Sequence, residues 1–128
     1  SNMVLSTDLN LLSVLQFAVE ILHVKHIIVC GHHNCGGIKA AMQDESYGLM
    51  DQWIWNIKDV YRMHRAEIES KQGEEEKRQL FTLLNVKEQV LNLAKTSIIQ
   101  NAWSLICFIL IHIRKCSAPP QPHLGLTG

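Results

Sequence analysis

The sequence predicts an α/β protein in which helices surround a mainly parallel sheet. A short β-branched run at residues 26–30 ends at Gly31, and segments with helical periodicity lie on both sides of it. The order of helix, buried strand, loop and helix is typical of α/β folds. A second continuously apolar run, residues 104–113, is strand-like. Most of the remaining chain has helical periodicity, so we expect a mostly helical domain.

The first predicted helix covers residues 7–23, with Ser6 or Thr7 as its N-cap. The strand "HIIVC" follows, and its uninterrupted apolar character predicts burial on both faces. Gly36 and Gly37 then precede "IKAAM", which suits the start of a second helix. The apolar positions that recur at helical spacing in the first helix are Leu11, Leu12, Leu15, Phe17, Ala18, Val19 and Leu22.

The middle of the chain is predicted to be helical as well. Residues 49–68 form one helix, and the charged run 69–78, with Gly73 inside it, is a solvated turn. A further helix begins near Asn85, where Asn85 and Glu88 resemble a capping box. Residues 114–128 are Pro-rich and predict an irregular tail. The predicted apolar faces consist of Trp53, Ile57, Val60 and Met63 in one helix and of Val86, Val90, Leu93, Ile98 and Ala102 in the next.

Composition limits the classes of function. The 128 residues suffice for a single domain, and we see no internal linker. Zero net charge gives no support for a nucleic acid or an anionic membrane as partner. The longest apolar stretch, residues 105–113, is too short to span a bilayer. The opening Ser1 and Asn2 are interpreted as a cloning remnant. No secretory leader precedes the cysteines, so we expect a cytoplasmic protein with reduced thiols, in which metal binding is favoured over disulfides.

The loop after the first strand carries His32, His33 and Cys35 in close succession. The i, i+3 spacing allows His32 and Cys35 to bind one zinc ion, although a catalytic zinc has three protein ligands. An ordinary glycine-rich turn is the main alternative. Cys35 could also act as a nucleophile near a helix N-terminus, with His33 as base. A phosphate-binding loop fits less well, because no Lys-Ser or Lys-Thr follows the glycines.

Several of these residues form a longer pattern. Asn10, Ser13, Ala18 and Val19 in the first helix are followed by Gly31, His32, Cys35, Gly36 and Gly37. Together they resemble the β-class carbonic anhydrases, and the resemblance covers residues 7–103. It implies a mainly parallel sheet, a homodimer or higher homo-oligomer, and reversible hydration of carbon dioxide to bicarbonate at a zinc held by two Cys and one His. His32 and Cys35 match two of these ligands, and Gly36 and Gly37 would bring the backbone close to the site.

The resemblance is incomplete at both ends. No Cys-x-Asp-x-Arg strand, which supplies the first zinc ligand of the family, precedes Asp8, and the tail from residue 104 diverges. We therefore assign no catalytic residue and expect a truncated domain with little activity, or an inactive fragment that self-associates. A thiol-reactive protein that uses Cys35 is a third reading. Residues that could replace the missing ligand are Cys30, His33, Cys107, His112, Cys116 or a residue of a partner chain.

Overall fold

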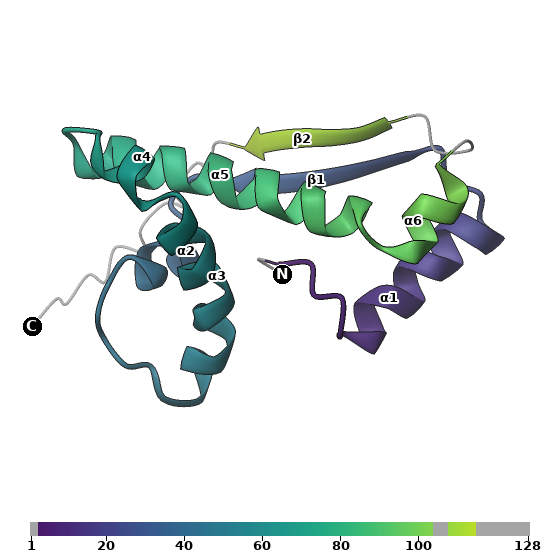
Figure 1. Ribbon diagram of the computed structural model, residues 1–128, viewed down its shortest axis with the longest axis horizontal. Coiled ribbons are helices and arrows are strands. Elements are labelled where there is room, and N and C mark those ends of the chain that lie inside the picture. Colours follow the sequence, from purple (N-terminus) through teal and green to yellow (C-terminus); the bar gives the residue numbers. More distant parts are fainter. Residues whose placement is uncertain (1–2, 104–107, 115–128) are drawn as a thin grey trace, which may run out of the picture.

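The computed structural model describes residues 3–103 and 108–114 (Figure 1). Helices make up most of this part of the chain, and two strands form the sheet. The element η1 is a π-helical turn and η2 is a 3₁₀ turn. The elements follow one another as α1 (Leu9–Gln16), η1 (Phe17–Ile21), β1 (His26–His32), α2 (Gly36–Ala41), η2 (Gly48–Met50), α3 (Asp51–Met63), α4 (Arg65–Glu69), α5 (Glu74–Ala94), α6 (Ser97–Ala102) and β2 (Phe108–Arg114).

The two strands are parallel, which confirms the predicted α/β class for an incomplete sheet. The register runs from His26 opposite Phe108 to His32 opposite Arg114. The long helix α5 extends beneath the pair in Figure 1 and contacts both strands. A parallel pair needs a crossover connection, and here the helices from α2 to α6 provide it.

Strand β1 is covered on one face only, so the prediction of burial on both faces is wrong. Its residues alternate between exposed and half-buried, and Ile28 on the outer face is 61% exposed. Helix α5 packs against the inner face, where Val29 and Gly31 lie. No other element among the described residues covers the outer face in Figure 1.

Helix α5 is longer than the sequence predicted. It begins at Glu74, inside the charged run, and Asn85 lies buried in its middle, so the capping box at Asn85 is wrong. Glu74, Glu75 and Glu76 occupy the first turn, where carboxylates interact favourably with the helix dipole. The solvated turn is therefore limited to the residues around Gly73.

The start of the first helix and the end of α5 also differ from their predicted positions. Helix α1 is capped by Asp8, not by Ser6 or Thr7, because Asp8 Oδ1 accepts hydrogen bonds from the backbone N–H groups of Asn10 and Leu11. The helix predicted to reach residue 102 ends at Ala94. The short helix α6 then begins under a new cap, Thr96.

The buried face of α3 is also shifted from the predicted one. Ile54, Ile57 and Val60 are buried, whereas Trp53 and Met63, both predicted on this face, are exposed. The helix stops at Met63, and α4 begins after His64 instead of continuing in one piece. Ile57 and Val60 were placed correctly, but the face that packs on α2 and α5 is rotated about the helix axis towards Ile54 and away from Met63.

The interior consists of two apolar clusters. The first lies among α2, α3, α4 and α5, and the second joins α1 and η1 to the end of α5 and to α6. The cavity described below borders the first cluster, to which Met3, Cys35 and Ile38 belong. Cys107, Cys116 and the predicted irregular tail lie outside the described residues, except for Arg114, which ends β2.

Candidate metal centre

The loop between β1 and α2 is a tight turn. Strand β1 ends at His32, and Asn34 adopts a left-handed backbone conformation with a φ of 56°. Asn tolerates this conformation better than most residues that have a side chain. Cys35 then takes the N-cap position of α2, which begins at Gly36, two residues before the predicted start at Ile38. The turn therefore brings Cys35 back towards the end of the strand.

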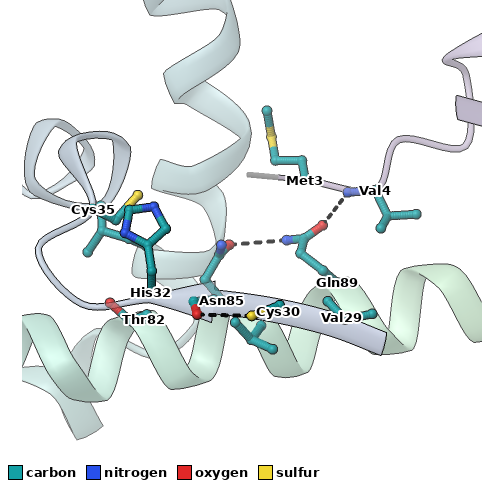
Figure 2. Close-up of a pocket in the computed structure, with 12 residues that line it drawn as sticks. Met3, Val4, Val29, Cys30, His32, Cys35, Thr82, Asn85 and Gln89 are labelled. Atoms are coloured by element: carbon teal, nitrogen blue, oxygen red, sulfur yellow. Dashed lines mark hydrogen bonds between the residues drawn. The ribbon is translucent and has the colours of Figure 1, made fainter. Parts of the chain in front are cut away.

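His32 and Cys35 line one cavity of about 200 Å³ (Figure 2). Its walls come from the end of β1, from the loop, from α5 and from the segment before α1, so residues from distant parts of the chain enclose it. The lining residues are Met3, Val4, Val29, Cys30, Gly31, His32, Cys35, Ile38, Thr82, Asn85, Val86 and Gln89.

The imidazole of His32 is oriented for metal binding. Its Nδ1 lies 3.0 Å from the carbonyl oxygen of His33. Because a carbonyl oxygen only accepts hydrogen bonds, Nδ1 must carry the proton, which leaves the lone pair of Nε2 available to a metal. Metal-binding histidines commonly donate their second ring N–H to such a partner. The geometry of His32 therefore fits zinc.

Cys35, the second predicted zinc ligand, also lines the cavity. Cys35 is only 8% exposed and packs in the core cluster with Met3 and Ile38. The predicted ligand pair is thus present at one cavity, with one donor on the strand and one on the helix cap. A buried thiol reacts slowly with external electrophiles, which weakens the reading of Cys35 as a freely reactive nucleophile.

Two buried carboxamides on α5 complete one wall of the cavity, and the sequence analysis missed both. Gln89 Oε1 accepts a hydrogen bond of 2.7 Å from the backbone N–H of Val4, and Gln89 Nε2 donates to Asn85 Oδ1 at 3.1 Å. Figure 2 shows both bonds: the first links α5 to the N-terminal segment, and the second lies within α5 and orients Gln89. The i, i+4 spacing of Asn85 and Gln89 among apolar residues was the available signal.

Gly31 is the position where β1 approaches α5 most closely. A Cβ placed there would lie 2.5 Å from Val86 Cγ2. At Gly36, by contrast, a Cβ would meet nothing within 4 Å. The close approach of β1 to α5 therefore depends on Gly31, and the expected role of Gly36 and Gly37 beside the metal site stays a prediction.

The candidates for a third ligand lie in different places. His33 lines a separate hollow with Glu75 and Arg78, and the Arg78 guanidinium, which donates to Glu75, holds the pKa of that carboxyl below its usual range. Cys30 borders the cavity, whereas His112, its register partner on β2, is not among the residues that line it. Among residues 3–103 and 108–114, no three His, Cys, Asp or Glu side chains converge as they lie on a common metal position.

Comparison with known proteins decides the family. The family model described as "Carbonic anhydrase" matches residues 1–112. The chain belongs to the β-class carbonic anhydrase family. The match extends beyond the predicted segment 7–103 at both ends and includes Ser1 and Asn2, which the sequence analysis had set aside as a cloning remnant.

Curated carbonic anhydrases are similar to the chain over most of its length. A carbonic anhydrase of Emericella nidulans is 38% identical over 112 residues, which are 88% of this chain and 49% of that protein. Beta carbonic anhydrase 6, mitochondrial, of Arabidopsis thaliana is 34% identical over 80% of this chain and 32% of its own length. The chain therefore spans half the length, or less, of these two relatives.

Solved β-carbonic anhydrases share the fold. One of two tetrameric enzymes from Sordaria macrospora superposes with a TM-score of 0.81 at 31% identity, over 88% of this chain and 58% of that one. A Coccomyxa enzyme, solved in complex with acetazolamide, gives 0.78 at 31% identity over 88% and 52%. Among the described residues, no helix has the length and apolar character needed to cross a bilayer.

Proposed function

We propose that the protein serves the zinc-dependent, reversible hydration of carbon dioxide to bicarbonate, with His32 and Cys35 as two of its zinc ligands. The observation that carries this proposal is the shared cavity, in which Nε2 of His32 is free and the Cys35 thiol forms part of the wall. Zinc bound there would lower the pKa of a coordinated water to about 7 and so supply a nucleophile near neutral pH.

The 128-residue chain is expected to have little hydration activity by itself. Two predicted zinc ligands, His32 and Cys35, line one cavity, and a catalytic zinc has three protein ligands. The residues of this chain would hold the metal and enclose the reaction space, with Gln89 fixing the N-terminal wall through Val4. We propose the cytoplasm as its location, although one similar relative is named mitochondrial.

Zinc content per chain tests the proposal. Protein purified without added metal and then exposed to zinc should retain it, and the variants His32→Ala and Cys35→Ser should each lose it. His32 is exposed, so its replacement should leave the fold intact, and far-UV circular dichroism controls for damage by the Cys35 variant. Zinc retention that is equal in wild type and both variants would contradict the proposal. Stopped-flow hydration assays on the same samples measure the activity.

A second candidate function is self-association, and the exposed surface of the first helix favours it. Five large apolar residues of α1, η1 and the next position are mostly exposed: Leu9, Val14, Phe17, Ile21 and Leu22. We call this set the α1–η1 surface. Exposed apolar patches of this kind mark interaction sites. Similar enzymes from Sordaria macrospora are described as tetrameric, which supports a homo-oligomer here.

Sedimentation velocity over a range of protein concentrations tests self-association. We expect the weight-average sedimentation coefficient to rise with concentration, because hydrophobic association follows mass action. A single monomeric species at every concentration would remove this candidate. The zinc proposal would stand independently of that result.

A further inference from the structure

We propose that residues 3–5 form a strap that closes the cavity of the candidate metal centre, and that Gln89 controls how often this strap opens. The inference rests on the proposed function and extends it to the entry of carbon dioxide and water into the cavity. Met3 and Val4 line the cavity from the strap, and Gln89 lines it from α5. Figure 2 shows the hydrogen bond that joins the strap to α5.

The strap bridges the two apolar clusters of the interior. Met3 is buried in the first cluster and Leu5 packs against it, whereas Val4 packs against the second cluster. Side chains that alternate in this way are typical of an extended segment, and residues 3–5 belong to no helix or strand. The strap therefore lies across the junction of the two clusters and contacts both of them.

A hydrogen bond to a buried side chain fixes the strap on α5. The Val4 N–H donates to Gln89 Oε1 at 2.7 Å, and Gln89 Nε2 donates to Asn85 Oδ1 at 3.1 Å, which orients the Gln89 carboxamide. Both carboxamides are buried, with exposed fractions of 5% for Gln89 and 6% for Asn85. Without the Gln89 acceptor, the Val4 N–H would lose this partner in the closed form only, because water reaches it in the open form. The open form would then become more populated.

Opening of the strap would connect the first cavity to a second one. Met3 and Gln89 also line this second cavity, which has a volume of about 200 Å³ and lies between α3 and α5. Asp59, Glu88 and Asn92 give it a polar wall, which suits water. Because Met3 and Gln89 border both cavities, a movement of the strap away from α5 joins them. The second cavity then becomes a route by which small polar molecules reach the candidate metal centre.

Alkylation of Cys35 by iodoacetamide in the full chain, with a chelator present, tests the inference. Cys35 is buried, lines the first cavity and belongs to the same cluster as Met3, so its modification rate reports the population of the open form. The exposed Cys30 is the internal reference, and fragment ions in mass spectrometry distinguish the two thiols. We expect Gln89→Met, which removes the acceptor at a similar side-chain volume, to raise the Cys35 rate about two- to tenfold, the range expected for one hydrogen bond. The Cys30 rate should not change.

Two control variants and one further measurement separate opening of the strap from a general loss of stability. Gln89→Glu keeps an oxygen acceptor for Val4 and should keep the slow Cys35 rate, as should Asn92→Ala, which lines only the second of the two cavities. Hydrogen exchange of the α3 amides reports global unfolding. If Gln89→Met leaves the Cys35 rate unchanged, or raises α3 exchange by the same factor, the inference fails. The zinc content of wild type decides the proposed function separately, because alkylation is measured without metal.

Discussion

Gly31 allows β1 to pack closely against α5, the longest helix, because glycine has no side chain. Replacement with Ala would place a Cβ 2.5 Å from Val86 Cγ2, a distance that requires β1 or α5 to move. We expect Gly31→Ala to lower the free energy of unfolding by about 1–3 kcal/mol, as overpacking typically does. Urea denaturation followed by circular dichroism measures the change.

Gly36→Ala is the matched control for this substitution. The added Cβ meets nothing within 4 Å, and Gly36 lies in the first turn of α2, where Ala is the better helix former. We expect no loss of stability and a gain of up to about 1 kcal/mol. The double variant Gly31→Ala, Val86→Ala should recover part of the loss. Equal effects of Ala at positions 31 and 36 would refute the close-packing argument.

Single residues of the candidate site differ in how well the sequence reveals them. The position of His32 and Cys35 at one cavity could be predicted, because their residue types and their spacing suit zinc binding. Gln89 was missed, because a polar residue in a helix ordinarily indicates a solvent-facing position. Its role depends on the backbone N–H of Val4, which is 85 positions away in the sequence. Only the folded chain brings the two together.

At the scale of elements, the boundary between α5 and α6 depends on one hydroxyl group. Thr96 Oγ1 donates to the carbonyl of Leu93 at 2.7 Å and accepts from the N–H of Ile99 at 3.4 Å. We expect Thr96→Ala to cost about 0.5–2 kcal/mol through the loss of this cap. Thr96→Ser, which keeps the hydroxyl, should retain most of the stability in thermal unfolding. Equal losses in both variants would assign the effect to the methyl group instead.

Helices α4 and α5 are joined by a small polar cluster. Glu69 accepts from Lys77 Nζ at 2.6 Å and also from the Tyr61 hydroxyl. The Lys77 hydrogen bond, followed by that of Tyr61, lowers the pKa of Glu69 below its usual 4.5. The bond to Glu69 raises the pKa of Tyr61 above 10.0 and that of Lys77 above 10.5.

These pKa shifts predict how stability changes with pH. The lowered pKa of Glu69 contributes stability that is present above pH 4.5 and is lost as the pH falls through the lower folded value. The raised pKa of Tyr61 contributes stability that is present below pH 10.0 and is lost as the pH rises through the higher folded value. Glu69→Gln should reduce both losses in urea midpoints measured from pH 3 to 11.

Both effects should be small, because the Glu69 side chain is 39% exposed and solvent screens its interactions. Glu76→Gln is the control, since Glu76 is exposed in the same first turn of α5 and has no ion pair in the described structure. Its pH profile should follow that of wild type. A Glu69→Gln profile identical to wild type would show that the cluster contributes nothing measurable.

Element existence was largely predictable, and element boundaries were not. The apolar periodicity located β1, α2 and α3 correctly. It could not show that the helix breaks at His64, or that α5 continues through Asn85, because both depend on tertiary packing. His64 Nε2 lies 3.0 Å from Glu88 Oε1 on α5, and this contact fixes the corner between α3 and α4. The apolar periodicity of one helix does not predict a contact with a side chain of another helix.

At the scale of the whole molecule, the α1–η1 surface predicts assembly. Phe17 and Ile21 lie one helical turn apart and are 55% and 62% exposed. We expect Ile21→Lys to reduce self-association by about tenfold or more, because a buried unpaired charge opposes an apolar interface. Sedimentation velocity measures the shift. Leu83→Lys, at an exposed apolar position on α5, should leave self-association unchanged.

The parallel pairing of β1 with β2 also determines the order in which the chain can fold. The helices from α2 to α6 separate the two strands in the sequence, so the contact of the strands closes a long loop, and contacts of this kind form late. The helices from α2 to α5 form through local contacts and can be complete earlier. During synthesis, β1 leaves the ribosome long before β2. The nascent chain therefore carries β1 without its partner β2 until the crossover helices have been made, a period in which chaperones would have most effect on its yield.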